Sequence, residues 1–345
     1  MRYLDERVWV ILNELRPLID RQHIDITKWQ IKKKLFMRPC EADKDETPWE
    51  NFDSAKDRWY GKDTYYWFRS QFTVPQSMDG KCIFLKIHTQ IEEWDDGRNP
   101  QFLLFVNGKV TQGQDMNHRE VRLTDCAKAG ETYTLDLQAY TGILHNEFSL
   151  MVTASETDLA LLKLYYDLKA PADAYHYNRM MQGRTKSLIV EALNGALNLL
   201  DLRTPHSPEF DASVAAAQEY INEHLYKNPE LSSHDEIIAS SIGHTHIDVA
   251  WWWTVSQTRE KTARSFSTVL KLMEEYPNYK FMSSQPQLYV FLKERYPEVY
   301  EKVKERVKEG RWIPEGGMWL EADCNLTSGE SLVRQFLYGK QFFKE

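Results

Sequence analysis

The feature that most constrains the fold is a change in hydrophobic periodicity along the chain. Over residues 59–153, apolar and polar residues alternate in short runs such as YYWFRSQFTV and ETYTLDLQAY, and Gly, Asn, Asp and Pro separate these runs. A period of two with frequent turn residues is typical of an antiparallel β-sandwich. Asn107-Gly108 is the strongest hairpin turn, because both positions tolerate positive φ. The sequence therefore predicts a β-sandwich domain over residues 53–156.

The amino terminus has a different pattern. Apolar residues recur at helical spacing over residues 8–18, and residues 24–37 mix charged and apolar side chains in the same way. This spacing predicts two short helices. Residues 1–52 are therefore interpreted as an amino-terminal helical segment.

Helical spacing returns after the β-rich stretch. One apolar stripe runs over residues 188–200 and another over residues 214–225, with a break between them that contains Ser207 and Pro208. Together with Pro205, these residues interrupt the helical pattern and separate the two helices. We expect a helical connector over residues 157–233 whose apolar face packs against another part of the protein.

Strand and helix patterns alternate in the last part of the chain, residues 234–345. A β-α-β-α order indicates a parallel sheet or barrel, whose active sites lie at the carboxyl ends of the strands. The expected fold class is α+β and multidomain, ending in the start of a parallel β/α barrel-like catalytic domain. The strands are expected over residues 236–243, 279–284 and 312–319, and the helices over residues 258–276, 297–308 and 328–344.

Composition narrows the function classes. The 345 residues are 42% hydrophobic and 27% charged, which is ordinary for a folded protein of about two or three domains. The net charge of −8 comes without a long block of Lys or Arg, so nucleic acid is not expected as a partner. No stretch approaches the roughly 20 apolar residues of a membrane span. The oligomeric state stays open, and a homo-oligomer is compatible with the sequence.

The amino terminus and the cysteines bear on the compartment. Asp5 and Glu6 precede an apolar run that is too short for a secretory signal. The four cysteines are far apart and form no CxxC pair, so we expect reduced and mostly buried thiols. Together these observations predict a cytoplasmic protein.

The first cluster of chemically active residues follows the strand expected at residues 236–243. His244, His246 and Asp248 are each two residues apart, so on an extended backbone they project from the same face. Two imidazoles and a carboxylate suit a zinc ion, although an HxH pair also occurs in purely structural settings. Three tryptophans follow at residues 251–253. At least one is expected to face the site, because three consecutive indoles are hard to bury on one side of a regular element.

A second cluster lies in the stretch RWIPEGGMWLEADCN. Glu321 and Asp323 share parity after a strand, and Gly316 and Gly317 permit close approach of the backbone. Asp323 could bind a metal ion or attack a carbon atom. The alternative is an acidic turn before the next helix, for which Ser328 is the better placed N-cap.

These clusters resemble glycoside hydrolase family 38, the zinc-dependent α-mannosidases, in particular their cytosolic or vacuolar and bacterial branch. The resemblance covers about the last 110 residues closely and the upstream part more loosely. Four blocks carry it in order: His244, His246, Asp248 and Trp251; TREKTARSF; SSQPQLY; and EGRWIPEGGMWLEADCNLTSGESLVRQ.

The resemblance implies a role for each matching residue. His246 and Asp248 would bind zinc, and Asp323 would be the nucleophile that also touches the metal. His244 would lie beside the ligands or face the substrate. Trp251 would form the aromatic floor under the mannose ring, and Arg334 would hold the Asp323 carboxylate or the sugar hydroxyls.

The reaction implied is hydrolysis of terminal α-mannosides of glycans through a covalent mannosyl-enzyme, with retained configuration. The partner would be a mannose-containing oligosaccharide. The family's remaining zinc ligand is a histidine and its general acid an aspartate, both beyond the nucleophile. No histidine follows His246, and no aspartate follows Asp323. We therefore predict that the chain is an incomplete part of such an enzyme and inactive alone.

Two other function classes stay open. An amidohydrolase-like zinc hydrolase also places an HxH pair on a first barrel strand, but it needs further histidines on later strands. A non-catalytic carbohydrate-binding protein would instead use the β-sandwich as its working part, although fold alone does not establish function.

Overall fold

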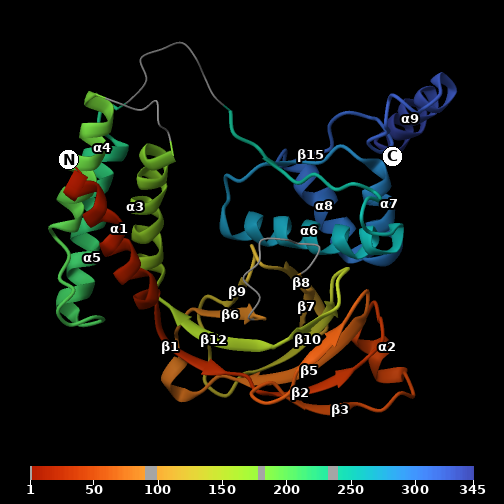
Figure 1. Cartoon of the computed structure of the whole chain (residues 1–345), viewed down its shortest axis with the longest axis horizontal. Helices are drawn as coiled ribbons and strands as arrows, with labels where there is room; N and C mark the ends of the chain where they lie inside the picture. The colour runs from red at the N-terminus through yellow and green to blue at the C-terminus, as the bar shows by residue number, and fades with distance from the viewer. Residues whose placement is uncertain (1, 90–98, 178–182, 232–239) are drawn as a thin grey trace.

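The computed structural model describes residues 2–89, 99–177, 183–231 and 240–345. Figure 1 shows a cluster of helices on one side, a β-sandwich, and a β/α segment that lies over the sandwich and ends in helix α9. The protein is therefore an α+β chain with separate helical and antiparallel β parts. No helix in the described ranges is long and apolar enough to cross a membrane.

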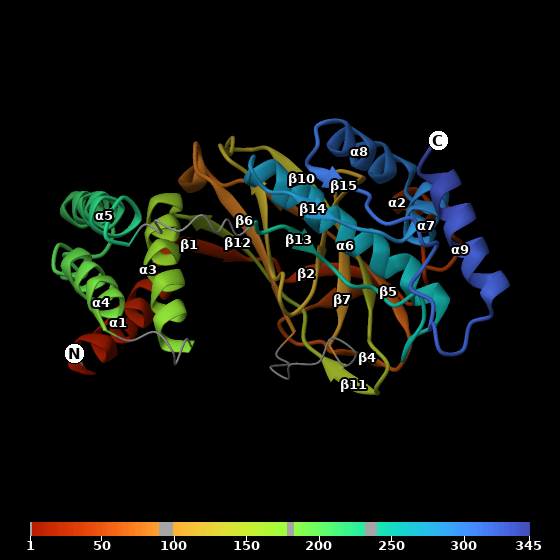
Figure 2. The ribbon, with the colours of Figure 1, turned by 90° about the horizontal axis from the view of Figure 1, so that it is seen from above.

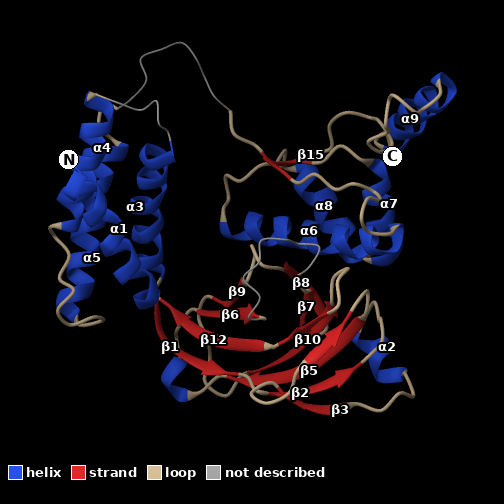
Figure 3. Cartoon of the chain, in the orientation of Figure 1, coloured by secondary structure: helices blue, strands red, loops and turns tan. Residues whose placement is uncertain are grey.

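The β-sandwich consists of two main sheets in which every strand pair is antiparallel (Figure 3). The predicted antiparallel sandwich is confirmed. One sheet contains β1 (Asp20–Asp25), β12 (Met151–Thr157), β6 (Ile83–His88) and β9 (Glu120–Thr124). The other contains β3 (Glu50–Asp53), β2 (Lys28–Lys32), β5 (Tyr65–Thr73), β10 (Thr132–Tyr140), β7 (Gln101–Val106) and β8 (Lys109–Gln114).

Short elements complete the sandwich. The strands β4 (Trp59–Gly61) and β11 (Asn146–Phe148) pair with each other, and helix α2 (Pro39–Lys44) lies between β2 and β3 in the sequence. The hairpin between β7 and β8 turns at Asn107 and Gly108, whose φ angles are 50° and 79°. The predicted hairpin turn is thus confirmed, and its reason is the positive φ at both positions.

The helix predicted over residues 24–37 is wrong. This stretch contains the end of β1 and all of β2, so the segment 1–52 is not helical throughout. In β2, Trp29 is 3% exposed and lies in the core between the sheets, while Ile31 pairs with Phe68 of β5. Aromatic and β-branched residues fit a pleated, half-buried surface, and pairing with β5 outweighs the local helical spacing.

Strand β7 of the six-stranded sheet is buried on both faces. Phe102 and Leu104 of β7 lie in the core between the two sheets. Leu103 and Phe105 point the other way, into a second core formed with helix α6 (Val255–Glu275). This explains why β7 reads QFLLFV, an unbroken apolar run, where a sheet with one wet face would alternate.

The helical cluster has its own core. It consists of α1 (Arg2–Leu15), α3 (Leu159–Tyr177), α4 (Arg184–Leu197) and α5 (Pro208–Ile221). The helix predicted over residues 8–18 is confirmed up to Leu15, and a 3-10 turn follows. Ser207 caps α5 by accepting a hydrogen bond from Phe210 N at 3.1 Å, and Pro208 is the first helical residue. The predicted break before α5 is therefore a helix start.

The carboxyl-terminal part contains a parallel three-stranded sheet in the order β13 (Gly243–His244), β14 (Phe281–Met282), β15 (Trp312–Ile313). The parallel pairing is as predicted, but the strands are much shorter. Residues 236–239 of the predicted first strand lie outside the described residues. The helices are α6, α7 (Pro286–Arg295), α8 (Pro297–Lys308) and α9 (Gly329–Phe342).

The helices agree better with the sequence patterns. In α6 the predicted inward residues are 0–6% exposed, namely Ala263, Phe266, Leu270 and Met273. Helix α7 was not predicted. The division into four domains stays a prediction.

The cysteines differ from the expectation. All four are free thiols, but Cys40, Cys126 and Cys324 are exposed, and only Cys82 is half-buried. The prediction of mostly buried thiols is wrong. The exposed three lie in a short helix, a turn and a loop, where the local structure leaves little apolar surface to cover a side chain.

Candidate functional site

The carboxyl ends of β13, β14 and β15 lie side by side because the strands are parallel and in register. The predicted site residues follow these ends. His244 closes β13, and its Nδ1 lies 3.0 Å from the carbonyl oxygen of Met282, the last residue of β14. His244 therefore ties two neighbouring strands together, and its Nδ1–H is the donor.

His246 and Asp248 come together in the loop after β13. His246 Nε2 lies 3.2 Å from Asp248 Oδ1. On the other edge of the ring, His246 Nδ1 lies 3.1 Å from Glu321 Oε2. The three side chains are 38–53% exposed, so water reaches them. The imidazole is thus held between two carboxylates from distant parts of the sequence.

The pair of His246 and Asp248 fits two ligands of one zinc ion. Two donors about 2.0–2.1 Å from a tetrahedral zinc ion lie roughly 3.3 Å apart, close to the distance between these two atoms. A carboxylate on the other ring nitrogen, as Glu321 provides, is the usual partner of a metal-binding histidine. Over the described ranges, no group of three or more His, Cys, Asp and Glu side chains could hold a metal ion. Glu321 cannot be a third ligand, because it faces the opposite edge of the ring.

The three tryptophans form an exposed aromatic group. Trp251 and Trp252 are 64% and 70% exposed, and their rings stack with centroids 5.0 Å apart. Trp253 is half-buried, and its Nε1 donates to the carbonyl oxygen of Asp248 at 3.2 Å. The loop that carries Asp248 therefore also presents two open indole faces, to which a sugar ring could stack.

Asp323 and Arg334 are not brought to this pair. Asp323 lies in an exposed turn, where its Oδ1 accepts a hydrogen bond from Asn325 N at 3.0 Å. Arg334 is on the exposed side of α9 and binds Glu330 at 2.8 Å. Its Nη1 also donates to the Tyr338 hydroxyl at 3.3 Å. Glu330 and Tyr338, the i,i+4 neighbours on the helix, satisfy the Arg334 guanidinium. Among the described residues, no hydrogen bond or ion pair joins Arg334 to Asp323.

The predicted cap of α9 is confirmed. Ser328 is the N-cap, and its hydroxyl accepts a hydrogen bond from Ser331 N at 3.2 Å. The turn that contains Asp323 leads into this cap. Asp323 is therefore free of a capping role in α9.

These residues lie in a segment that matches a known protein family. Residues 236–345 match the model described as the glycosyl hydrolases family 38 N-terminal domain. This segment is similar to family 38. The match spans every predicted site residue and confirms the resemblance that the sequence motifs predicted. We refer to residues 236–345 as the family 38 segment.

Curated relatives extend the similarity upstream. Alpha-mannosidase G from Dictyostelium discoideum is 32% identical over 303 residues, which cover 82% of this chain and 26% of that protein. Human alpha-mannosidase 2C1 is 30% identical over 80% of this chain and 27% of its own length. Yeast alpha-mannosidase is 45% identical over 30% of this chain and 10% of its own. The chain spans about a quarter of the length of the first two relatives.

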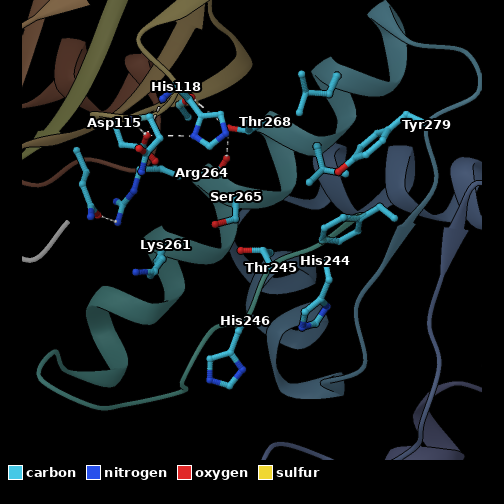
Figure 4. A pocket seen from close by; sticks show the side chains of 16 residues that line it. Asp115, His118, His244, Thr245, His246, Lys261, Arg264, Ser265, Thr268 and Tyr279 are labelled. Atoms are coloured by element: carbon cyan, nitrogen blue, oxygen red, sulfur yellow. Dashed lines mark hydrogen bonds and ion pairs between the residues drawn. The ribbon is translucent and has the colours of Figure 1, made fainter. Parts of the chain in front are cut away.

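A cavity of about 340 Å³ lies where the family 38 segment meets the sandwich. Figure 4 shows that His244, Thr245 and His246 form one wall, and that α6 contributes Lys261 and Arg264. Asp115 and His118 reach it from the segment after β8, with His118 Nδ1 3.1 Å from Asp115 Oδ1. Burial would raise the pKa of Asp115, but the hydrogen bonds and charge of His118 outweigh it and lower that pKa.

Two features of this site were missed by sequence reasoning. The position of Glu321 was noted, but not its contact with His246. Arg264 was not singled out, although it is only 9% exposed and donates to Gln101 of β7. Its signal was a charged residue on the apolar face of α6, where an arginine needs a specific partner. Sequence spacing could not reveal either contact, because the partners are 75 and 163 residues away in the chain.

Proposed function

We propose that this chain is part of a retaining, zinc-dependent α-mannosidase that hydrolyses terminal α-mannosides of mannose-containing oligosaccharides. The observation that carries the proposal is the contact of His246 with Asp248 inside a segment that matches family 38. The names of the relatives, all alpha-mannosidases, support the substrate class. In this proposal the parallel sheet is the beginning of a β/α barrel.

Asp323 is the proposed nucleophile. Its carboxylate would attack the anomeric carbon as the glycosidic C–O bond breaks, and the departing oxygen would take a proton from a general acid. Water would then attack the same carbon, releasing mannose with retained configuration and freeing Asp323. The aspartates of this chain all precede or include Asp323, so the general acid is proposed to come from a part of the enzyme that this chain does not span.

His246, Asp248 and Asp323 are the proposed zinc ligands within this chain. Zinc would supply positive charge that binds sugar hydroxyls and stabilises charge in the transition state. Glu321 would accept a hydrogen bond from the Nδ1–H of His246, so that the unprotonated Nε2 can face the metal. Asp323 is two residues from Glu321, so its Cα lies within about 7 Å of the Cα of a residue that already contacts His246. To bind the same ion, the Asp323 carboxylate would have to reach the Nε2 side of His246, opposite to Glu321.

The other predicted residues have binding roles in this proposal. Trp251 offers an open face for the apolar side of the mannose ring. His244, bound to the end of β14, would face the sugar with its other ring nitrogen. Arg334 would exchange its partners on α9 for the carboxylate of Asp323 or for sugar hydroxyls.

Zinc titration of the whole chain by calorimetry tests the metal site. We expect His246→Ala and Asp248→Asn each to weaken zinc binding at least tenfold, and Glu321→Gln to weaken it by roughly ten- to a hundredfold. His224→Ala, in the helical cluster, is the control and should leave the affinity unchanged. Zinc binding that is equal in all five proteins would overturn the proposed site.

The catalytic role of Asp323 needs a polypeptide that also contains the remaining part of the enzyme. There, Asp323→Asn should abolish both mannosidase turnover and formation of the covalent mannosyl-enzyme, which mass spectrometry detects. A fully active variant would exclude Asp323 as nucleophile. The chain of 345 residues by itself is expected to be inactive.

The two alternative functions receive less support. An amidohydrolase-like site is less well supported, because the segment that carries the HxH pair matches the family 38 model. A sandwich acting alone as a carbohydrate-binding protein would have part of one sheet face covered, because the family 38 segment packs on Trp67, Leu103 and Phe105. Titration with mannose oligosaccharides tests the latter, and binding that survives in Trp251→Ala and His246→Ala would favour it.

A further inference from the structure

The first turn of α6 contains a side chain that contacts both the family 38 segment and the sandwich. Gln257 is 7% exposed, and its Oε1 accepts a hydrogen bond from Thr254 N at 2.9 Å. In return, Thr254 Oγ1 accepts from Gln257 N at 3.4 Å, so the two residues form a capping box. One half of the Gln257 amide therefore fixes the residue that follows the three tryptophans.

The other half of the same amide binds the sandwich. Gln257 Nε2 donates to Asp63 Oδ1 at 2.6 Å and to the Tyr140 hydroxyl. The Tyr140 hydroxyl in turn donates to Asp63 Oδ1 at 3.1 Å. Burial, and then the charge of Asp63, raise the pKa of Tyr140, so the phenol keeps the proton that it donates.

Asp63 is itself held firmly. It lies in the turn between β4 and β5 with φ of 50°, and its backbone N–H donates to the carbonyl oxygen of Gly142 at 2.8 Å. Tyr140 is the last residue of β10, and its ring packs on Tyr65 with centroids 5.0 Å apart. The carboxylate and the phenol that bind Gln257 are thus parts of the sandwich framework.

The loop that carries Asp248 is fastened to the same turns of α6. Thr258 Oγ1 donates to the carbonyl oxygen of Val249 at 2.5 Å, and Trp253 Nε1 donates to that of Asp248 at 3.2 Å. Lys261 Nζ lies 4.2 Å from the centroid of the Trp253 ring. The path of the loop over residues 248–254 is therefore set by the position of the start of α6.

We propose that Gln257 is a positioning residue through which Asp63 and Tyr140 of the sandwich hold the loop of Asp248 and Trp251 in place. The sandwich then serves the candidate site as a fixed support. The role of the loop in zinc and sugar binding rests on the proposed function, whereas the hydrogen bonds from Gln257 to Asp63 and Tyr140 do not depend on it.

A simple helix cap is the competing explanation, and Gln257→Glu separates the two. Glutamate at this position completes a capping box as well as glutamine does, so the cap is retained. Its carboxylate has no proton to donate to Asp63 and is repelled by it, so only the link to the sandwich is lost. The double variant Gln257→Glu/Asp63→Asn restores a donor opposite the new acceptor, because the side-chain amide introduced at position 63 can donate to the carboxylate.

Gln218→Glu is the matched control. Gln218 of α5 donates to Asp167 Oδ2 at 2.8 Å, the same kind of amide–carboxylate bond, but within the helical cluster. Hydrogen exchange followed by mass spectrometry is the measurement. It reports the backbone amides of residues 249–254 separately from those of β10 and α8.

Gln257→Glu is expected to accelerate exchange in residues 249–254 by about tenfold or more, since a hydrogen bond to a charged group is lost. The double variant should return to the rate of the unmodified chain, and Gln218→Glu should not change it. An unchanged rate in Gln257→Glu would overturn the proposal. So would an equal acceleration in α8 and β10, which would indicate general destabilisation, or a failure of the double variant to slow exchange.

Zinc titration of the same variants connects the link to the site. The affinity should fall in Gln257→Glu by several-fold and recover in the double variant, as expected when a supporting residue lets a ligand move. A chain that binds no zinc in any form would contradict the proposed function, and hydrogen exchange would still decide on the link. Zinc affinity that is unchanged in Gln257→Glu, in a chain that binds zinc, would contradict the positioning role.

Discussion

The sandwich meets two neighbours, and the two contacts differ in kind. Toward the family 38 segment it shares a hydrophobic core, in which Trp67 and Phe105 of the sandwich pack with Phe266 of α6. Toward the helical cluster the contacts of Arg21 are polar: this residue of β1 binds Asp158 and Asp211, each at 2.6 Å. Figure 2 shows the helical cluster at one end of the molecule and the family 38 segment over the sandwich.

This difference between the two contacts predicts which parts of the protein unfold together and which unfold independently. Buried apolar area is the dominant favourable term in folding, whereas exposed ion pairs contribute about 0–1 kcal/mol each. Parts that share a core should therefore unfold together. The sandwich and the family 38 segment are expected to behave as one cooperative unit, and the helical cluster, whose described core contains no strand of the sandwich, as another.

The largest expected effect comes from Phe105→Ala, which removes a fully buried ring from the shared core. It should lower the free energy of unfolding by about 3–5 kcal/mol and shift the sandwich and the family 38 segment together. Urea unfolding followed by tryptophan fluorescence measures this, because nine of the ten tryptophans in the described residues lie outside the helical cluster. Leu193→Ala, in the core of the helical cluster, is the control. If the family 38 segment unfolded while the sandwich stayed folded, the comparison would be wrong.

An intermediate effect is expected from Glu260, a fully buried residue of α6 in the shared unit. Its Oε1 binds Arg295 Nη1 at 2.9 Å, and in the described part of the chain its Oε2 has no hydrogen-bond partner. Burial raises the pKa of Glu260 above its ordinary value of 4.5, although Arg264 and Arg295 oppose the shift. A raised folded pKa means that stability is highest below 4.5 and falls as pH rises through the folded pKa.

Glu260→Gln should remove that part of the pH dependence. Relative to this variant, the unmodified chain should lose unfolding free energy as the pH rises above 4.5 and through the raised folded pKa of Glu260. Urea unfolding at a series of pH values measures the difference. Glu330→Gln, on the exposed side of α9, is the control and should leave the profile as it is. Parallel profiles for Glu260→Gln and the unmodified chain would contradict the assigned pKa direction.

The smallest effect is expected from Arg21→Met, which breaks the ion pairs to the helical cluster while keeping the apolar stem. The expected loss is about 1 kcal/mol or less, because the Arg21 side chain is 27% exposed and water screens the charges. Hydrogen exchange should quicken only where α3 and α5 begin. A loss as large as that in Phe105→Ala would show that the helical cluster also belongs to the cooperative unit.

Local patterns predicted the elements that depend on short-range chemistry. The Asn107-Gly108 hairpin, the Ser328 cap and the apolar face of α6 all follow from residues that are close in the sequence. The stretch of β2 was misread as helix because its charged and apolar residues fit both periods. Pairing with β5, which is distant in sequence, decided between them.

The candidate site likewise contains residues that short-range spacing predicted and contacts that it did not. The spacing HxHxD and the family resemblance were enough to single out His246 and Asp248, because both lie on one short loop. The carboxylate on the far side of the imidazole, Glu321, comes from the end of another strand, and Arg334 proved to bind its own helix neighbours instead of Asp323. Such contacts depend on how strands and helices pack, which short-range spacing does not specify.

The sequence by itself thus determined the Asn107-Gly108 hairpin, the Ser328 cap, the apolar face of α6, and the loop that offers histidine and aspartate side by side. Only the tertiary structure decided that both faces of β7 are buried, that Glu321 contacts His246, and that Gln257 joins the loop of Asp248 to the sandwich. The physical reason is the range of the interactions. Turns, caps and periodicity are fixed by neighbours along the chain, whereas burial and hydrogen bonding between distant segments exist only once the whole chain has packed.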